Sequence, residues 1–421
     1  MDSVNYPSSM CKHAIALVIA VVATVACGNG DEVRQPDTEE RARQLAQELM
    51  IVDTHIDVPY RLTEEEADIG EATEGGDFDY PRAVAGGLNV PFMSIYVPAS
   101  YQETGGARDL ADELIDLVEG VVDEHPGKFA LAGSVDDVKR EVGRGKIVLA
   151  MGMENGAPIE GDLANVQYFF DRGIRYITLT HSKSNAICDS SYDENRQWNG
   201  LSPFGREVVA EMNRVGIMVD ISHVTDETAV QAIALSTAPV IASHSSCRRF
   251  TPDWERNMSD ELIRQVAETG GVVQVNFGSG FVNEDYHREW LVQWDAFDQY
   301  VEEHEIESDS DEAKAFREEY REGHPLELAD VGDVVDHIDH IVQLVGIDHV
   351  GLGSDFDGLG DSLPRGLADV SQYPNLIHEL LERGYTEEDI EKICSSNILR
   401  VWAEVERVAR SFAAGGEGPA S

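Results

Sequence analysis

The residues of this chain that could do chemistry are histidines and carboxylates placed where short apolar runs end. His55 and Asp57 lie in the run IVDTHID, residues 51–57. In an extended strand, residues two apart point to the same side, so both side chains would project together from the end of a strand. They could bind a divalent metal ion, although one such pair is more often a strand end followed by a polar turn. The metal interpretation becomes stronger because the same pattern, an apolar run that ends in His, Asp or Glu, recurs along the chain.

Further apolar runs end in residues of the same kind. The endings are MGMEN with Glu154, TH with His181, DISH with His223, SHSS with His244, and GSDFDG with Asp355. Each ending alone would be an ordinary polar strand end, but their joint occurrence is hard to explain without a metal centre.

The suggested ligands are three histidines and two carboxylates, namely His55, Asp57, Glu154, His223 and His244. These donors suit zinc or a similar divalent ion, and none is a thiolate. A single catalytic zinc keeps an open position and takes fewer protein ligands. Two ions that share a carboxylate fit the set better, and such pairs lower the pKa of a bridging water so that hydroxide is available near neutral pH.

The elements that must position these residues are strand-length apolar runs separated by helical patterns. We expect strands at residues 50–57, 90–98, 147–155, 174–181, 217–223, 240–245, 271–277 and 350–357. The clearest helical patterns cover residues 38–50, 204–215, 226–235, 260–269 and 334–345. Ser202, Thr225 and Ser259 occupy N-cap positions, and glycines at 216, 270 and 346 mark helix ends.

Apolar strands that alternate with amphipathic helices are typical of a parallel sheet covered on both faces. Eight such units favour a closed (β/α)8 TIM-type barrel over an open doubly wound sheet, and they bring the strand ends together at one rim, where barrel active sites lie. A glycine-rich GxGxxG turn does not follow the first strand, which argues against a dinucleotide-binding fold.

A charged helical insertion, residues 284–328, precedes the last strand. It places Trp290, Trp294, Phe297 and Tyr300 on one helix face. These aromatic side chains could pack on the barrel, or the insertion could form a lid or a dimer contact. The sequence leaves these alternatives open.

Composition limits the partners of the chain and the role of its cysteines. The 421 residues carry a formal net charge of -47, which argues against nucleic acid as a partner. The five cysteines are Cys11, Cys27, Cys188, Cys247 and Cys394, and they show no CxxC spacing, so neither a disulfide framework nor a thiolate zinc site is expected.

The front of the chain reads as a targeting segment. The apolar run 14–26 is shorter than the roughly 20 residues of a transmembrane helix and is followed by Cys27, as in a bacterial lipoprotein signal. We expect a signal peptide at 1–27 with a possible lipid anchor at Cys27, a linker at 28–37, a hydrolase domain at 38–410 and a flexible tail at 411–421. Ordinary secretory cleavage and an uncleaved anchor are alternatives, and all three predict a location outside the cytoplasm, in the periplasm or on a bacterial membrane.

Seven motifs in order resemble those of the membrane (renal-type) dipeptidase family. They are VDTHID (52–57), GMEN (152–155), LTH (179–181), DISH (220–223), SHSS (243–246), RN (256–257) and GSDFDG (353–358). Each motif alone is weak, whereas seven in order are strong, and the resemblance extends from about residue 41 to 408. The mammalian disulfides have no counterpart here.

The resemblance implies a binuclear zinc site and a role for each site residue. His55 and Asp57 would bind one Zn²⁺, His223 and His244 the other, and Glu154 would bridge them. His181 would contact the substrate carbonyl or the oxyanion. Arg256 would bind the substrate's C-terminal carboxylate, and Asp355 would bind its amino group and pass a proton to the leaving amine.

The activity implied is hydrolysis of free dipeptides, L,L and also L,D, by a metal-bridging hydroxide. The family's habit also implies a homodimer. Two other functions stay open from the residues alone: a different binuclear amidohydrolase-type barrel hydrolase, and a non-catalytic envelope lipoprotein that binds a metal or a peptide. The first usually opens with His-x-His, whereas this chain has His55 and Asp57, and the second would lack a proton shuttle such as Asp355.

Overall fold

A nearly closed barrel of parallel strands forms the centre of the computed structural model, which describes residues 37–307 and 310–415. The strands follow one another in the order β1 (Ile51–Ile56), β2 (Leu88–Tyr96), β4 (Ile147–Glu154), β5 (Ile174–Thr178), β6 (Met218–Asp220), β7 (Ile241–Ala242), β8 (Val272–Val275) and β9 (Val350–Leu352). The circle closes where Asp57 N–H donates to Phe356 O at 2.8 Å and Asp355 N–H donates to His55 O at 3.0 Å. The predicted (β/α)8 fold is confirmed.

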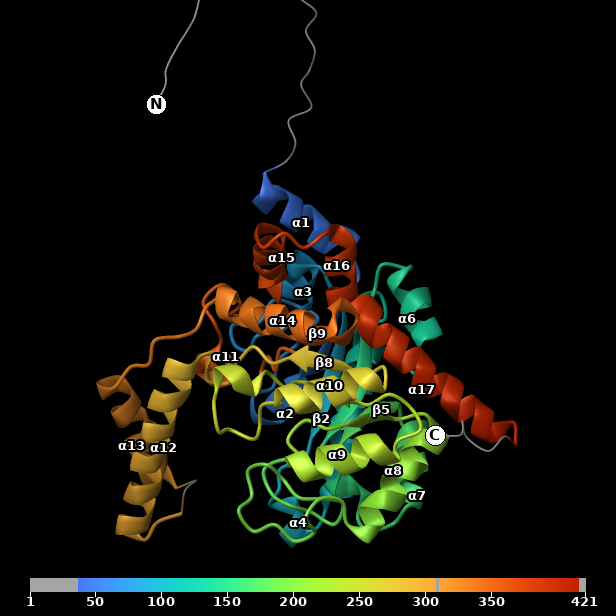
Figure 1. Cartoon of the computed structure of the whole chain (residues 1–421). Coiled ribbons are helices and arrows are strands. Elements are labelled where there is room, and N and C mark those ends of the chain that lie inside the picture. The colour runs from blue at the N-terminus through green and yellow to red at the C-terminus, as the bar shows by residue number, and fades with distance from the viewer. Residues whose placement is uncertain (1–36, 308–309, 416–421) are drawn as a thin grey trace, which may run out of the picture. The chain divides into compact units, whose positions relative to one another are not determined.

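Helices cover the outside of the barrel (Figure 1). In the first half of the chain these are α1 (Thr38–Glu48), α2 (Val58–Glu64), α3 (Tyr80–Gly86), α4 (Tyr101–Thr104), α5 (Ala107–Glu124), α6 (Val135–Val142) and α7 (Ala164–Asp171). The second half adds α8 (Pro203–Val215), α9 (Asp226–Leu235), α10 (Asp260–Glu268), α11 (Ser279–Val282), α12 (Glu284–His304), α13 (Asp311–Gly323), α14 (Val331–Val345), α15 (Tyr373–Glu382), α16 (Glu387–Glu391) and α17 (Asn397–Ala413).

The predicted caps begin the helices that separate the later strands. The side chains of Ser202, Thr225 and Ser259 each accept a backbone N–H three residues further on, at the starts of α8, α9 and α10. Such bonds satisfy N–H groups that a helix leaves free at its first turn. The predicted caps are therefore confirmed.

One short strand was not predicted. β3 (Phe129–Leu131) pairs with Ile147–Leu149 at the start of β4, whereas β2 pairs with the later part of β4 from Ala150 onward. A run of three residues is too short to show a strand period in the sequence. β3 lies off the circle of the barrel and leaves the rim unchanged.

The barrel interior is filled by side chains rather than left as a channel. Its core includes residues from every second position of neighbouring strands, such as Val90 and Phe92, and it is joined by Trp402 of α17. The rings of Trp402 and Phe92 lie 5.3 Å apart, and those of Phe92 and Tyr176 lie 5.7 Å apart. Tyr176 in turn contacts His55, so a packed aromatic column runs through the barrel to the rim.

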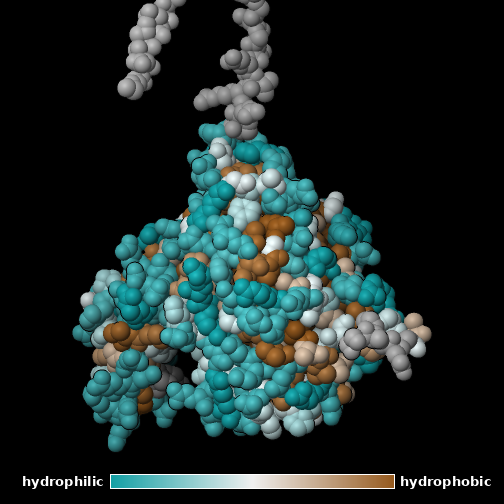
Figure 2. Space-filling view, viewed as in Figure 1, coloured by the Kyte–Doolittle hydropathy of each residue, from teal (hydrophilic) through white to brown (hydrophobic). Residues whose placement is uncertain are grey.

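The insertion before the last strand folds as a hairpin of α12 and α13. Tyr300 of α12 and Phe316 of α13 stack with ring centroids 3.9 Å apart. Trp290, at the start of α12, lies 6.0 Å from Trp254 of the barrel. The aromatic face therefore packs against α13 over most of its length and against the barrel at its start. Figure 2 shows apolar surface on this hairpin, where Leu291 and Val292 are 43% and 57% exposed.

The predictions for the two ends of the chain can be compared with the structure only in part. The predicted signal peptide and most of the predicted linker lie outside the described residues. At the other end α17 runs to Ala413, so residues 411–413 continue a helix where a tail was expected. Within the described ranges, no helix combines the length and the apolar character needed to span a bilayer.

Candidate active site

The rim brings together every residue that the sequence proposed as a metal ligand. His55 is the penultimate residue of β1, Asp57 directly precedes α2, Glu154 ends β4, and His223 and His244 follow β6 and β7. All five are nearly or fully buried. His181 and Asp355 lie in the segments that follow β5 and β9, and both reach the same cluster.

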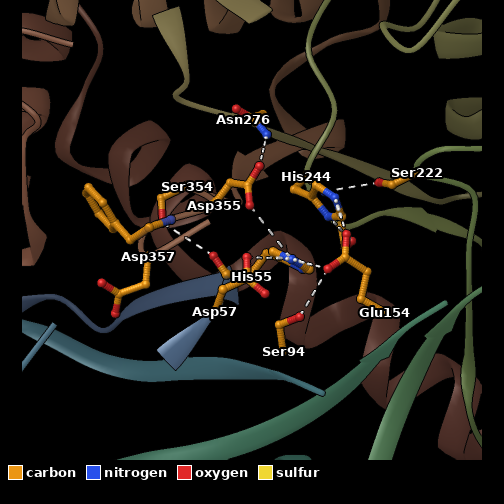
Figure 3. A network of polar contacts seen from close by, with 12 residues as sticks. His55, Asp57, Ser94, Glu154, Ser222, His244, Asn276, Ser354, Asp355 and Asp357 are labelled. Carbon is orange, nitrogen blue, oxygen red and sulfur yellow. Dashed lines mark hydrogen bonds and ion pairs between the residues drawn. The ribbon is translucent and has the colours of Figure 1, made fainter. Parts of the chain in front are cut away.

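Glu154 contacts histidines through both of its carboxylate oxygens, and Figure 3 shows its side chain pointing toward His55 and His244. Its Oε2 lies 3.4 Å from His55 Nε2, and its Oε1 lies 3.0 Å from His223 Nε2 and 3.4 Å from His244 Nε2. His181 Nε2 lies 3.6 Å from the same Oε1. The two oxygens therefore face different histidines.

Two further acidic residues, Asp57 and Asp355, lie close to His55. Its Nε2 lies 3.5 Å from Asp57 Oδ2 and 3.9 Å from Asp355 Oδ1. Asn276 donates its amide to the other oxygen of Asp355 at 2.7 Å and so fixes the direction of that carboxyl group. Together with Glu154, three carboxyl groups thus converge on one imidazole nitrogen.

The residues present fit a metal centre. Among residues 37–307 and 310–415, His55 Nε2 and Asp57 Oδ1 are buried without a hydrogen-bond partner, an arrangement that costs free energy unless something else binds them. Three sets of side chains each bring their ligand atoms within 4.8 Å of one another: His55, Glu154 and His244; Glu154, His181 and His223; and His55, Asp57 and Asp355. The donors are imidazoles and carboxylates, which suit divalent transition ions.

Burial and neighbouring charges determine the pKa values of the histidines at the rim. Burial lowers the pKa of His223 well below its usual value, and the Arg256 guanidinium adds to this effect. Burial also lowers the pKa of His244. Both shifts favour the neutral ring, which is the form that binds a metal ion.

His55 behaves in the opposite way. Burial acts to lower its pKa, but Tyr176 and the carboxylates of Asp57 and Glu154 outweigh burial and raise the pKa well above its usual value. The carboxylates therefore attract positive charge to this point of the rim, whether a proton or a metal ion.

The two other central carboxyl groups differ from each other. Burial acts to raise the pKa of Glu154, but His55 and His181 outweigh it and hold the pKa well below its usual value. Burial and the neighbouring Asp57 raise the pKa of Asp355 well above its usual value. Glu154 is thus the charged member of this pair, and Asp355 is the one suited to carry a proton.

The backbone at the site adopts an uncommon conformation. His223 and Asp355 have φ angles of 69° and 67°, in the left-handed region that side chains other than glycine rarely enter. Such conformations cost about 1 to 3 kcal/mol each and are typical of functional sites. Here they turn two strand-end side chains into the cluster.

Arg256 lies beside His223 and is 3% exposed. It donates to Ser245 Oγ at 2.7 Å and to His244 O at 2.8 Å, and its Nη2 lies 3.1 Å from His223 Nε2. The guanidinium is therefore held against the ligand cluster by the backbone and side chains that follow β7.

Several supporting residues were not proposed from the sequence. Tyr176 OH lies 2.7 Å from His55 Nδ1, and Gly152 permits this contact, since a Cβ at that position would lie 1.9 Å from the tyrosine ring. Asp53 and Asp220 are buried and accept backbone N–H groups at the rim. An available signal was an aspartate placed two or three residues before a site histidine, within an otherwise apolar run.

Comparison with known proteins agrees with this geometry. The membrane dipeptidase family (peptidase family M19) matches residues 39–415. An uncharacterised dipeptidase of Schizosaccharomyces pombe is 32% identical over 415 residues, covering 95% of this chain and 91% of that protein. The dipeptidase tcpJ of Claviceps purpurea is 34% identical over 344 residues, covering 80% of this chain and 71% of that protein.

Solved structures give the same result. The probable dipeptidase PvdM from Pseudomonas aeruginosa is 26% identical, has a TM-score of 0.75, and covers 88% of this chain and 98% of its own. A metallopeptidase from Rhodobacter sphaeroides, liganded with a phosphinate mimic of the dipeptide L-Ala-D-Ala, is 25% identical with a TM-score of 0.70 and covers 85% of this chain and 99% of its own. This chain therefore belongs to the membrane dipeptidase family and is a metal-dependent dipeptidase.

Proposed function

We propose that this enzyme is a zinc-dependent dipeptidase that hydrolyses free L,L-dipeptides and L,D-dipeptides at the rim of its barrel. The observation that carries the proposal is the position of Glu154, whose Oε2 lies 3.4 Å from His55 Nε2 and whose Oε1 lies 3.0 Å from His223 Nε2. A carboxylate placed in this way can bridge two ions, with His55 and Asp57 on one side and His223 and His244 on the other. The imidazole and carboxylate donors suit zinc.

Bound zinc would supply Lewis-acid activation of the scissile carbonyl and of water. The side chains around it would supply the remaining steps. His181, whose Nε2 lies 3.6 Å from Glu154 Oε1, would donate an N–H to the carbonyl oxygen as that oxygen gains negative charge. Asp355 would bind the substrate's amino group and deliver a proton to the leaving nitrogen, which suits its raised pKa.

Arg256 would hold the substrate's C-terminal carboxylate. Two of its nitrogens are committed to Ser245 Oγ and His244 O, whereas its Nε is buried without a partner in the described part of the chain. A guanidinium fixed in this way matches the planar geometry of a carboxylate. With Asp355 at the other end of the substrate, a tripeptide could not satisfy both groups, which accounts for a restriction to dipeptides.

The stereochemical part of the proposal has separate support. The Rhodobacter sphaeroides relative was solved with a mimic of L-Ala-D-Ala, a dipeptide whose second residue has the D configuration. By analogy with this relative, we propose that both configurations are accepted at the second position of the substrate.

The experiment is to measure zinc content and hydrolysis on one purified sample that lacks residues 1–27. We expect about two zinc ions per chain, cleavage of L-Ala-L-Ala and L-Ala-D-Ala, and no cleavage of L-Ala-L-Ala-L-Ala. Zinc binding without turnover of either dipeptide would contradict the proposal. Cleavage of the tripeptide would contradict the assignment of Arg256 and Asp355 as terminal clamps.

Arg256→Ala tests the clamp directly. Loss of a charge-assisted hydrogen bond should raise KM for dipeptides by about 10- to 100-fold. Arg249→Ala removes the same charge from an exposed position nearby and should leave KM unchanged. An unchanged KM in Arg256→Ala would remove that residue from the substrate site.

The location and the assembly of the enzyme stay proposals. A lipid on Cys27 and a location outside the cytoplasm depend on residues 1–36, which lie outside the described part. Labelled palmitate should enter the full chain but not a Cys27→Ala variant, and labelling of both would contradict the anchor.

The proposed homodimer predicts twice the chain mass in light scattering, and a monomer mass would contradict it.

A further inference from the structure

Two buried aspartates, Asp53 and Asp220, hold the backbone of the rim in the same way. Oδ1 of Asp53 accepts N–H groups from His55 and Ser354, both at 3.0 Å. Oδ1 of Asp220 accepts N–H groups from Ser222 at 3.1 Å and Ser243 at 2.8 Å. In each case one donor lies two residues further along the chain and the other lies at the end of the neighbouring strand. Each carboxylate therefore joins two strand ends where the regular ladder has stopped.

The second oxygen distinguishes the two aspartates. Oδ2 of Asp53 accepts from the hydroxyl of Tyr373. Oδ2 of Asp220 accepts from the hydroxyls of Thr178 and Ser243, the latter at 2.6 Å. The Ser243 hydroxyl also lies 2.7 Å from His244 Nδ1. Only the Asp220 arrangement leads on, among these contacts, to the imidazole of a proposed metal ligand.

The direction of the hydrogen bonds follows from what each group can donate. A carboxylate only accepts, and a serine hydroxyl has one proton to give. Ser243 must give that proton to Asp220, because otherwise two lone pairs would face each other at 2.6 Å. The contact between Ser243 and His244 then requires a proton on His244 Nδ1. The lone pair on Nε2 is left facing His223 Nε2 at 2.8 Å and Glu154 Oε1 at 3.4 Å, a group of ligand atoms that a bound metal ion would satisfy together.

We propose that Asp220 is a positioning residue of the metal site, which acts through Ser243 to keep the His244 proton on Nδ1 and Nε2 free for a metal ion. The inference rests on the proposed function, in which His244 is a metal ligand. Asp53 provides a matched comparison, because it makes the equivalent backbone bonds while His55 Nδ1 has a different partner, Tyr176.

Asp220→Asn should reverse the arrangement. The two backbone N–H groups at Oδ1 require the amide oxygen at that place, so the amide NH2 would face Thr178 and Ser243. Ser243 would then accept from the amide and give its own proton to His244 Nδ1. This places the ring proton on Nε2, where it opposes metal binding. We expect zinc affinity to fall by about 10- to 100-fold, the effect typical of groups that orient metal ligands.

Asp53→Asn is the matched control. Its amide oxygen would keep the two backbone bonds, and its NH2 would face Tyr373, from which no hydrogen bond within residues 37–307 and 310–415 leads to an imidazole Nδ1. Both variants should lose thermal stability, since each alters a buried charged group, but zinc affinity should fall much further in Asp220→Asn.

Two serine variants separate proton placement from packing. Ser243→Ala removes the partner of His244 Nδ1 and lets the ring take either tautomer, so zinc affinity should fall less than in Asp220→Asn. In the double variant Asp220→Asn with Ser243→Ala, the hydroxyl that reverses the proton is gone. The double variant should therefore bind zinc more tightly than Asp220→Asn alone, whereas a packing role predicts a further loss.

The measurement is competition for Zn²⁺ between the purified chain and a chromophoric chelator, with the melting temperature of each variant recorded. The expected order of affinity is wild type, then Ser243→Ala and the double variant, then Asp220→Asn. Wild-type affinity in Asp220→Asn, or weaker binding in the double variant than in Asp220→Asn, would overturn the inference. Should Asp220→Asn not fold, unchanged zinc affinity in Ser243→Ala would overturn it instead. A wild-type chain that bound no zinc would show first that the proposed function is wrong.

Discussion

The rim of the barrel and the α12–α13 hairpin are both rich in side-chain contacts, but they are built in different ways. At the rim, residues far apart in the sequence fix one another: Asp355 N–H donates to His55 O at 3.0 Å, and His55 Nε2 lies 3.4 Å from Glu154 Oε2. In the hairpin, the partners are neighbours in the sequence, such as Tyr300 and Phe316, whose rings lie 3.9 Å apart. The rim can exist only in the complete fold, whereas the hairpin depends mainly on itself.

The two regions also treat charge differently. The rim buries His55, Asp57 and Glu154 together, so each charge needs the others or a bound cation. The hairpin leaves its charged residues at the surface, where an ion pair such as Arg288 with Asp285 contributes little. A substitution should therefore have large and distant effects at the rim and small, local effects in the hairpin.

Glu154→Gln should produce the largest effect. The change keeps the size of the side chain but removes the charge shared by the proposed metal ligands. Since groups that only orient a metal ligand are worth about 10- to 100-fold, kcat/KM and zinc affinity should fall by at least about 100-fold. Enzyme assays and zinc content on the same sample check this.

Glu160→Gln is the control for this change. Glu160 is an exposed residue shortly after the same strand, so its loss of charge should leave activity and zinc content unaltered. Full zinc content in Glu154→Gln would show that the rim does not depend on its central charge, and the contrast with the hairpin would lose its main support.

The next effect concerns the junction between the two regions. The buried His337 of α14 accepts the N–H of Cys247 on Nδ1 at 2.8 Å, and its Nε2 lies 3.1 Å from Val282 O, just before α12. Burial lowers the pKa of His337 to about 3. Because this lies below the unfolded value of about 6.5, the unfolded chain binds a proton between these pH values and the folded chain does not.

Stability contributed by neutral His337 is thus complete above about pH 6.5 and is lost as the pH falls toward 3. The loss amounts to at most roughly 5 kcal/mol across that window. Urea unfolding at a series of pH values measures it, and His337→Asn should show a shallower pH dependence because it has no group that binds this proton. Equal slopes in the two proteins would mean that the junction does not control acid stability.

The sequence predicted the barrel better than it predicted the detail of the rim. Near-continuous apolar runs identified all eight strands of the circle, because strands buried on both faces leave a strong signal. The strands are shorter than predicted late in the chain, and β7 contains only Ile241–Ala242. Apolar residues beyond a strand end still pack in the core, so hydrophobicity alone does not show where pairing stops.

For the site, the residues that project into the rim were predictable and those that hold them were not. His244 stood out as a metal-capable residue at a strand end, but its dependence on Ser243 and Asp220 follows from hydrogen bonds between neighbouring strands. Tyr176 read as an ordinary strand residue, and its contact with His55 requires the space left by Gly152, its pairing partner on the neighbouring strand β4. Such relations exist only after the barrel has closed.

Trp290→Ala tests how far the hairpin is independent. Trp290 connects α12 to the barrel through Trp254, at a ring distance of 6.0 Å. Because the side chain is only half-buried, we expect a loss of about 1 to 2 kcal/mol in the free energy of unfolding and little change in kcat/KM. Leu291→Ala, at a neighbouring position that is 43% exposed, should change neither. A large fall in kcat/KM for Trp290→Ala would make the hairpin part of the active site.

Phe316→Ala should give the smallest effect. Its ring stacks on Tyr300 at an interplanar angle of 5°, and an aromatic pair of this kind contributes about 0.5 to 1.5 kcal/mol beyond the burial of its surface. Because both partners belong to the hairpin, hydrogen exchange should quicken in α12 and α13 while amides of β1 and β4 keep their protection. Tyr320→Ala, one turn further along α13, provides a second local change with the same expectation. If exchange in the barrel strands quickened equally, the hairpin and the rim would unfold as one cooperative unit, and the separation between a self-contained hairpin and an interdependent rim would be wrong.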